Sequence, residues 1–429
     1  MGGRATARGS AAPVVPCEVR DGNRARRPGR LPRRTVAGRR RAPTAPQPSR
    51  GTGEHPMSFR LKPITREEHL RFVTSRPSVS HLQVPSWGDV KPDWRAESLG
   101  WFDEGGELVG AGLVLLRPLP RLKRYLAYLP EGPVVDWSAD TLERWLDPLL
   151  AHLRERGAFT VRMGPPVVTR RWSAETVKAA IADPGARRLG DVEETVREPG
   201  AEDVAERLLR MGWRRTAAGG EDGFAAGQPR YVCQVPLAGR SEEDLRSGFN
   251  QQWRRNVKKA EKAGVKVVRG DLEDLDTFYD LYVETAERDR FVPRPLAYFR
   301  RMWTALTAED PDRMRLYLAH HDGEVLAAAT MLTVGEHVWY SYGASTSRRR
   351  EVQPNNALQW RMMCDARELG AAVYDFRGIT DTLDEDNHLL GLLRFKVGAG
   401  GQAVEYLGEW DYPLNRVLHR AVALYLARR

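Results

Sequence analysis

The chain of 429 residues contains only three cysteines, and no two of them are spaced as a disulfide framework or a zinc site would require. The nine histidines form no HxH or HExxH pattern. No run of about 18 apolar residues occurs, so no transmembrane helix is predicted. Residues 1–56 also lack the apolar segment of a secretory signal. These absences exclude the common disulfide-rich, metal-dependent and membrane-spanning classes, and we expect neither a metal ion nor a bound cofactor.

Basic charge in excess is confined to one end of the chain. Residues 1–56 contain 13 arginines, no lysine and three acidic residues, an excess of ten that equals the formal net charge of +10. The totals of 67 basic and 57 acidic residues therefore leave 54 of each sign in the remainder. Because residues 1–56 also lack a hydrophobic period, we expect a disordered basic tail, with the natural start at Met57. A basic arm that binds RNA or a membrane is the alternative.

Two stretches of the chain predict the same succession of elements. Each has two strands joined by a tight turn, a strand with tyrosine, a helix that ends at a glycine, and a further strand. The first comprises 99–102, 107–116, 125–129, a helix ending at Gly157, and 159–163; the second comprises 315–320, 324–334, 337–342, a helix ending at Gly370, and 372–376. An internal repeat of this length indicates two copies of one unit.

This order of elements is typical of the N-acetyltransferase-like (GNAT) fold. We therefore predict a mixed α/β (α+β) protein with two tandem GNAT-like domains. The predicted segments are a disordered tail at 1–56, the two domains at 57–235 and 236–412, and a C-terminal helix at 413–429.

Acyl-coenzyme A does not fit this sequence well as the acyl donor. GNAT enzymes hold the pyrophosphate of coenzyme A on a glycine-rich turn at the N-terminus of a helix. The corresponding segment of the second copy, residues 349–356, has no glycine, and that of the first copy, residues 130–133, has one glycine between prolines. A different acyl donor is indicated.

One segment of the otherwise neutral body is strongly basic. Residues 249–269 contain seven basic residues and one acid, and Arg254, Lys258 and Lys262 are spaced to share one helix face. The pattern is consistent with phosphate binding or with an ordinary solvated helix. Phe249 and Trp253 could bind base faces or anchor the helix. The candidate tRNA patch comprises Arg254, Arg255, Lys258, Lys259 and Lys262.

Several segments in both predicted domains together resemble Fem-type (FemABX) aminoacyltransferases. In the first domain these are Leu82-Gln83 with Trp87, Lys91 and Trp94, and Tyr128 with Gly132 to Asp136; in the second they are residues 254–265, 285–289, 294–295, 298–299, 339–343, 374–379, 394–396 and 406–409. The resemblance covers residues 57–429. Gly264 leads almost directly into a predicted strand at 266–268, which leaves no room for the inserted helical arm of some members. The chain is therefore most similar to compact, FemX-like members.

The resemblance implies the chemistry. An amine of the peptidoglycan precursor would attack the ester of an aminoacyl-tRNA, with glycine as the expected amino acid and either lipid II or UDP-MurNAc-pentapeptide as the acceptor. Aminoacyl-tRNA would be a co-substrate, and the protein would be cytoplasmic, at the inner face of the membrane where the acceptor is lipid-linked. Two alternatives stay open: an acyl-CoA-dependent GNAT N-acyltransferase, and a non-catalytic RNA- or envelope-binding protein.

The resemblance also implies roles for individual residues. Lys396, beside the glycines at 398, 400 and 401 that we expect to be flexible, would stabilise the oxyanion. Asp136 would orient or deprotonate the amine, or else belong to a turn. Lys91 and Arg294 would bind the precursor phosphates. Tyr340 and Tyr342 would line the cleft. Many relatives have arginine before Gly-Pro, where this chain has Glu131, and this departure weakens the assignment of Asp136.

Overall fold

The computed structural model describes residues 59–216 and 227–427. The predicted tail at 1–56 lies outside the described residues. Residues Ser58–Arg416 form one compact unit, and the helix α11 (Arg416–Ala427) begins where this unit ends. None of the helices in the described ranges combines the length and the apolarity that crossing a membrane requires.

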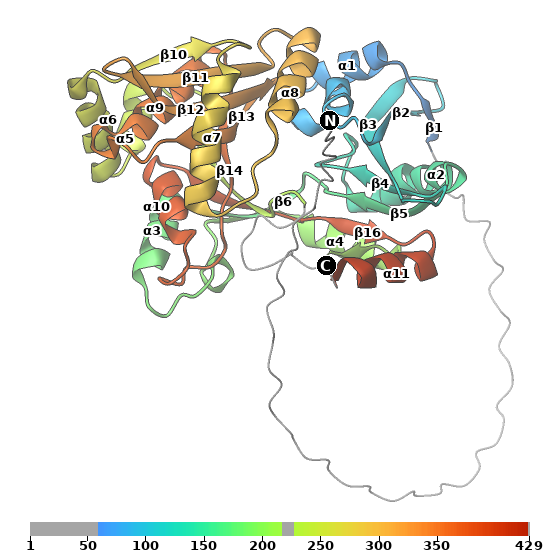
Figure 1. Ribbon diagram of the computed structural model, residues 1–429. Helices are drawn as coiled ribbons and strands as arrows, with labels where there is room; N and C mark the ends of the chain where they lie inside the picture. Colours follow the sequence, from blue (N-terminus) through green and yellow to red (C-terminus); the bar gives the residue numbers. More distant parts are fainter. Residues whose placement is uncertain (1–58, 217–226, 428–429) are drawn as a thin grey trace, which may run out of the picture. The chain divides into compact units, whose positions relative to one another are not determined.

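Two mixed sheets organise the unit (Figure 1). The first has the strand order β1-β2-β3-β4-β5-β16-β8 and the second has β10-β11-β12-β13-β14-β9-β15-β6-β7. The strands of the first sheet are β1 (Arg60–Pro63), β2 (Arg95–Phe102), β3 (Leu108–Pro118), β4 (Tyr125–Leu129), β5 (Ala158–Met163), β8 (Arg214–Arg215) and β16 (Trp410–Tyr412). Those of the second are β6 (Val168–Trp172), β7 (Val196–Arg197), β9 (Tyr231–Pro236), β10 (Lys266–Gly270), β11 (Met314–His321), β12 (Glu324–Val334), β13 (His337–Ser345), β14 (Val373–Gly378) and β15 (Gln402–Tyr406).

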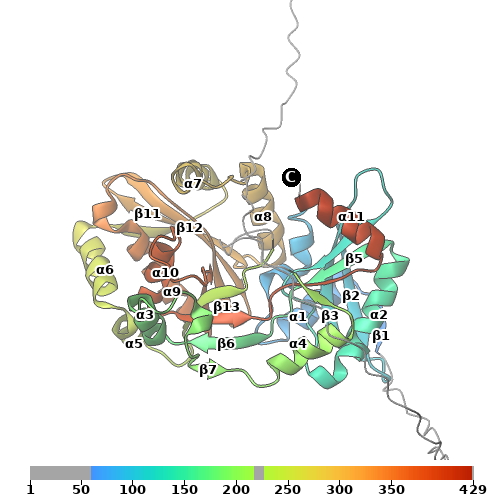
Figure 2. The same ribbon diagram turned by 90° about the horizontal axis from the view of Figure 1, so that it is seen from below.

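Helices pack on these sheets and connect their strands (Figure 2). The helices of the unit are α1 (Arg66–Thr74), α2 (Leu142–Glu155), α3 (Ala174–Ala182), α4 (Ala201–Arg210), α5 (Glu242–Gly248), α6 (Gln251–Ala263), α7 (Leu275–Asp289), α8 (Leu296–Glu309), α9 (Pro354–Glu368) and α10 (Leu390–Gly398). Short 3₁₀ turns include η1 (His81–Gln83) and η2 (Pro85–Gly88).

The predicted repeat is confirmed. The order β2-β3-β4-α2-β5 in the first half recurs as β11-β12-β13-α9-β14 in the second, and in each half the last two strands pair in parallel. Gly157 and Gly370 have φ values of 82° and 79°, a left-handed conformation that glycine adopts without strain where a helix ends. The tandem GNAT-like fold is therefore confirmed. α6 ends at Gly264 and β10 follows directly, so no helical arm is inserted there.

The two sheets nevertheless share the chain in an interleaved way. β16, near the C-terminus, pairs with β5 and β8 of the first sheet, while β6 and β7 from the first half of the chain extend the second sheet. β9 also lies in the second sheet, between β14 and β15. Strands from each half of the chain thus complete the sheet of the other half.

Three apolar clusters form the core, and the middle one belongs to both halves. It joins Val84 and Trp87 of the first half to Phe299, Met302 and Leu306 of α8. Strands β3 and β12 are buried on both faces, because alternate side chains of each enter the middle cluster and the cluster of its own half. This shared core fixes the two halves against each other.

Gln83 fixes the loop that follows β4. Its side chain is completely buried, its Nε2 donates to the carbonyl of Pro130 at 2.7 Å, and its Oε1 accepts from the amide of Leu113 at 3.0 Å. A Cβ atom on Gly132 would lie 2.4 Å from the amide carbon of Gln83, so this loop position must be glycine. The buried amide therefore determines where Glu131 lies.

Replacing Gln83 by leucine should destabilise the fold strongly. The Leu113 amide and the Pro130 carbonyl would lose their partners, at about 1–3 kcal/mol for each buried polar group. Urea unfolding should therefore show a loss of about 2–6 kcal/mol. Gln252→Leu, on the exposed face of α6, is the control and should change stability by no more than about 0.5 kcal/mol. Equal stability of the two variants would contradict this account.

Candidate functional site

Lys396 is buried, with 4% of its surface exposed. It lies on α10, and its Nζ donates a hydrogen bond of 2.6 Å to the carbonyl oxygen of Gly378 at the end of β14. Burial lowers the pKa of Lys396 to about 8, even though Asp375 nearby favours the charged form. No carboxylate pairs directly with this ammonium among the described residues. A buried cation of this kind is costly for a fold and is characteristic of functional sites.

The glycines after Lys396 are required for close packing. A Cβ atom on Gly398 would lie 2.7 Å from the Trp253 ring, and one on Gly401 would lie 2.4 Å from the sulfur of Cys233. Both glycines are therefore closely packed, and their expected flexibility stays a prediction. They allow α10 and β15 to approach α6 and β9 closely, and this close packing helps to hold Lys396 in place.

A cavity of 310 Å³ lies where the two halves meet. We call it the junction cavity. The first half contributes Ser78, Ser80 and Glu131, and the second contributes His337, Asp375, Arg377, Tyr406 and Glu409. With three carboxylates and one guanidinium, its lining is rich in acids and suits an amine-bearing ligand.

Arg377 joins the two halves across this cavity. Its guanidinium donates to Glu131 at 2.8 Å and to Gln228 at 2.7 Å, and its backbone amide donates to Asp375 at 2.6 Å. The backbone φ of Arg377 is 62°, an unusual value for a residue other than glycine or asparagine. Ser80 donates a further hydrogen bond of 2.6 Å to Glu131. Because Arg377 precedes Gly378, this network fixes the carbonyl that accepts from Lys396.

His337 lies between Ser78 and Asp375 in the lining of the cavity. Its Nε2 lies 3.4 Å from Asp375 Oδ2, its Nδ1 lies 3.3 Å from Ser78 Oγ, and its ring stacks on Trp339 with 4.2 Å between centroids. Burial alone would raise the pKa of Asp375. The hydrogen bond from His337, with Arg377 nearby, reverses this effect and lowers it. Asp375 is therefore a permanent anion beside Lys396 at neutral pH.

Lys91 and Arg294 approach the same aromatic ring. Lys91 Nζ lies 5.1 Å and the Arg294 guanidinium carbon 4.8 Å from the centroid of Tyr298. Burial, followed by repulsion from Arg294, lowers the pKa of Lys91 to about 8. Neither cation has a carboxylate partner in the part of the chain that the structure describes. Two adjacent cations without anionic partners have the charge that would suit a dianion such as a diphosphate.

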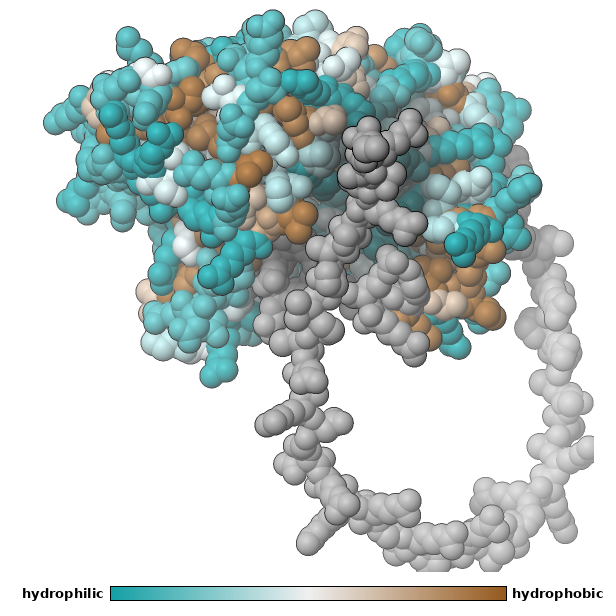
Figure 3. Space-filling model, viewed as in Figure 1, coloured by the Kyte–Doolittle hydropathy of each residue, from teal (hydrophilic) through white to brown (hydrophobic). Residues whose placement is uncertain are grey.

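The basic residues of α6 are exposed, whereas Trp253 of this helix and Phe249 just before it are not. Arg254, Arg255, Lys258, Lys259 and Lys262 are exposed, while Phe249 and Trp253 are 2% and 3% exposed and pack in the core. The aromatic pair therefore anchors the helix and presents no face for base stacking. Figure 3 shows mainly hydrophilic side chains over α5 and α6, at the left edge of the view.

Comparison with known proteins identifies the family. The profile of the FemAB family matches residues 64–322 and 309–426. The chain belongs to the FemAB family. Two lipid II:glycine glycyltransferases of Staphylococcus aureus, from strains MRSA252 and USA300, are each 26% identical in alignments that cover 84% of this chain and 94% of each relative. A crystal structure of FemX matches with a TM-score of 0.71 and 25% identity over 85% of this chain and 99% of FemX.

Membership confirms the resemblance seen in the sequence. The chain is a FemAB-family aminoacyltransferase of peptidoglycan bridge synthesis. This activity requires a site for an activated amino acid and a site for an acceptor. Lys396, the junction cavity and the Lys91–Arg294 pair are the features of this FemAB-family protein that suit those needs.

Tyr340 and Tyr342 do not share a face. They pair with the neighbouring residues Met331 and Thr330 of β12, so Ser341 is an extra residue that forms a β-bulge. Tyr340 consequently packs against the second-half core near Phe376, whereas the hydroxyl of Tyr342 lies 3.2 Å from that of Tyr298. Tyr342 alone therefore lies beside the Lys91–Arg294 pair.

Asp136 has the contacts of a turn residue. It is exposed, and its Oδ1 accepts hydrogen bonds from the amide and the hydroxyl of Ser138, at 3.0 and 2.7 Å. Its neighbours Val135 and Trp137 line the junction cavity, but Asp136 is absent from that lining. These contacts match the turn role that was the alternative for Asp136, and they supply no catalytic geometry.

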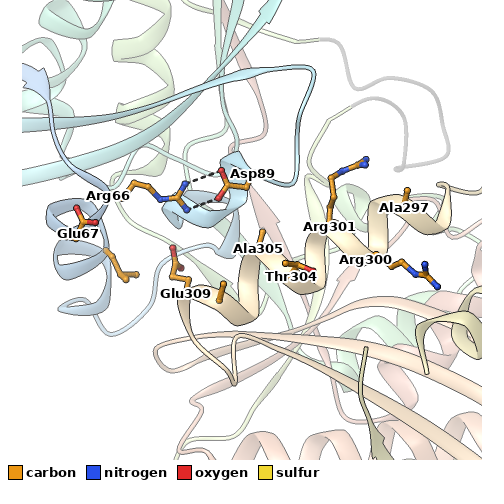
Figure 4. A pocket seen from close by; sticks show the side chains of 11 residues that line it. Arg66, Glu67, Asp89, Ala297, Arg300, Arg301, Thr304, Ala305 and Glu309 are labelled. Carbon is orange, nitrogen blue, oxygen red and sulfur yellow. Dashed lines mark hydrogen bonds and ion pairs between the residues drawn. The ribbon is translucent and has the colours of Figure 1, made fainter. Parts of the chain in front are cut away.

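A larger groove, of 760 Å³, lies between α1 and α8 (Figure 4). Arg66 faces Asp89 in a two-pronged ion pair, with a shortest distance of 2.8 Å, and Glu309 approaches from α8. None of the site residues predicted from sequence lines this groove. Its size alone therefore does not make it the catalytic centre.

Most of the junction cavity could not be predicted from the sequence. Residues 374–379 and Glu131 belong to family-like segments but had no predicted role, and His337 had none either. The weak signal for Arg377 was its place inside a family-like segment. Nothing in the sequence indicated that Arg377 and Glu131, 246 residues apart, would pair.

The Arg377–Glu131 pair should be energetically coupled. Each side chain is about one-fifth exposed, so Glu131→Gln or Arg377→Met should cost about 2–4 kcal/mol, somewhat less than a fully buried pair. The double variant should cost less than the sum, with a coupling of about 0.5–3 kcal/mol in urea unfolding. The exposed Arg210–Glu206 pair of α4 is the control, with a coupling of about 0.3–0.5 kcal/mol. Purely additive losses at Arg377 and Glu131 would refute the coupling.

Proposed function

We propose that this protein transfers glycine from glycyl-tRNA to an amine of the lipid-linked peptidoglycan precursor. The observation that carries the proposal is the buried Lys396 ammonium, bonded to the carbonyl of Gly378 next to Arg377 of the acid-lined junction cavity, in a chain of the FemAB family. The names of the Staphylococcus aureus relatives support glycine and lipid II as the substrates. The Lys91–Arg294 pair supports an acceptor that carries a diphosphate.

The chemistry requires little beyond positioning and charge stabilisation. The neutral acceptor amine attacks the ester carbonyl carbon, a C–N bond forms, and the carbonyl oxygen becomes an anion that Lys396 stabilises. The intermediate collapses, the C–O bond to the tRNA ribose breaks, and the proton lost by the amine goes to the leaving ribose oxygen. Glu131 and Asp375 accept hydrogen bonds from the neutral acceptor amine in the junction cavity, where it is held close to the ester. The exposed cations of α6 bind the tRNA backbone.

Coenzyme A is disfavoured as the donor by the start of α9. This helix follows β13, as the pyrophosphate-binding helix does in acyl-CoA-dependent GNAT enzymes, but it begins at Pro354, which has no amide hydrogen. The preceding Gln353 has φ of 61° and makes no side-chain cap. An N-terminus with one donor fewer and no glycine before it is a poor cradle for a pyrophosphate.

Lys396 should act on the transition state. Lys396→Met keeps much of the side-chain volume and removes the charge, so kcat should fall about 10²- to 10³-fold, while the dissociation constants of both substrates change only a few-fold. The measurement is single-turnover transfer from labelled glycyl-tRNA, with circular dichroism to verify folding. Near-normal kcat in a folded variant would remove Lys396 from the mechanism.

The pH profile supplies an independent test of Lys396. Its ammonium should lose its proton as the pH rises through about 8, so the wild-type rate should fall above this pH after correction for spontaneous ester hydrolysis. Lys396→Arg should keep partial activity, because a planar guanidinium replaces a compact ammonium only in part. Its rate should show no fall near pH 8, since arginine stays charged. The same fall in both proteins would assign it to another group.

Lys91 and Arg294 should determine the affinity for the acceptor. Losing a charged hydrogen bond costs about 1.5–3 kcal/mol, or about 10- to 150-fold in affinity. Lys91→Ala and Arg294→Ala should therefore raise KM for the precursor by that factor and leave glycyl-tRNA binding unchanged. Lys123→Ala, at an exposed position of the first half, should have no effect. Normal precursor KM in both variants would show that the diphosphate binds elsewhere.

A further inference from the structure

The connection between α7 and α8 exposes apolar side chains between two arginines. We call residues 290–295 the α7–α8 loop. Val292 is 92% exposed and Phe291 is 39% exposed. Arg290 and Arg294 flank them, both are exposed, and the loop contains no acidic residue. Most exposed apolar side chains need no explanation, but an apolar tip between unpaired cations is the composition of a membrane-contacting segment.

The ends of the two helices hold this loop in an extended form. Arg290, with φ of 58°, ends α7, and Pro295 is the residue from which α8 begins. The Phe291 amide donates to the carbonyl of Ala286 at 3.1 Å, and its ring lies 5.4 Å from that of Tyr282. Pro293 and Pro295 restrict the rest of the loop. Val292 therefore lies exposed in a short loop whose two ends are fixed.

Charge around the loop favours an anionic surface. Asp289 is already bonded to Arg288, at 2.9 Å, whereas Arg290 has no ion-pair partner among the described residues. Arg294 lies over the Tyr298 ring with Lys91 on the same ring. Each cation close to an anionic bilayer contributes about 1 kcal/mol. The loop thus combines an apolar tip with an unpaired cation on each side.

The position of the loop beside the diphosphate site argues for a membrane over other partners. A polyprenyl diphosphate keeps its chain in the bilayer, so its phosphates stay at the level of the lipid headgroups. The cations that bind those phosphates must then face the bilayer closely. Val292 is only two residues from Arg294, and Figure 2 shows α7 and α8 side by side at one edge of the second half.

We infer that the α7–α8 loop inserts Phe291 and Val292 into the headgroup region of an anionic membrane and so presents Lys91 and Arg294 to a lipid-linked acceptor. The inference rests on the proposed function in one respect, that the acceptor is lipid-linked. The bilayer contact itself can be measured without any transfer reaction.

Vesicle co-sedimentation of the full chain tests the contact. Val292→Ser and Phe291→Ser/Val292→Ser are compared with the wild type on vesicles of phosphatidylglycerol and phosphatidylcholine in equal parts. The double variant should bind at least about ten-fold more weakly, because it loses most of the inserted apolar surface. Arg290→Gln should weaken binding about five-fold. Leu209→Ser, 57% exposed on α4, is the matched control and should bind as the wild type does.

Measurements at high salt separate the contribution of the loop to vesicle binding from that of the arginine-rich residues 1–56, which the wild type and all the variants contain. High salt screens the attraction of those arginines to the vesicles, while the apolar difference between the wild type and the double variant should persist. Val292→Ser guards against misfolding, since a side chain so exposed supports no packing. Equal binding of the wild type and both serine variants at high salt would overturn the inference.

Transfer assays separate the membrane contact from the catalytic site. On an acceptor with a short, water-soluble chain, the double variant should keep the wild-type kcat/KM, whereas on acceptor embedded in vesicles it should lose activity. An equal loss on both acceptors would place the loop in acceptor binding and overturn the inference. The inference would also be overturned if, without vesicles, the wild type were dimeric and the double variant monomeric. The apolar tip of the loop would then be a contact between two copies of the chain. Failure of transfer with every acceptor would refute the proposed function and leave the vesicle result standing.

Discussion

An ion pair between Arg377 and Glu131 is the constraint on which the candidate site depends. It connects the end of β14 to the loop after β4, and so links the two GNAT-like halves directly at the junction cavity. Gln83 fixes the loop from one side, and Asp375 fixes the Arg377 backbone from the other. The carbonyl of Gly378, next to Arg377, then receives the Lys396 ammonium. Geometry at the cavity is therefore a property of both halves together.

The two halves share one fold, but the cations are distributed unequally between them. Lys396 comes from the second half alone, while the Lys91–Arg294 pair takes one residue from each half. Burial lowers the pKa of both lysines to about 8, so each is charged at neutral pH but less firmly than a surface lysine. A charged group that has already lost its water interacts more strongly with an anion than a solvated one does.

Much of the fold followed from local patterns. Hairpin turns, helix-ending glycines and alternating apolar residues predicted β2, β3, β4 and their counterparts, because those signals depend on neighbours in sequence. The site was only partly predictable. The bulge at Ser341 separates Tyr340 from Tyr342, and no rule of strand alternation predicts an inserted residue. The pairing of Arg377 with Glu131, and of β16 with β5, depends on contacts between distant segments. The role of Lys396 was predicted only from the family resemblance, because neither composition nor spacing indicated that this lysine is buried.

The most direct test of the central claim is to identify the product. The full chain is incubated with a mixture of aminoacyl-tRNAs and purified lipid-linked precursor, and separately with acetyl-coenzyme A and the same precursor, and the stem peptide is analysed by mass spectrometry. We predict a mass increase of one glycyl residue on the side-chain amine of the stem peptide, dependent on charged tRNA, and no acetylation. Acetyl transfer, or an unmodified stem peptide in the presence of every charged tRNA, would contradict the assignment.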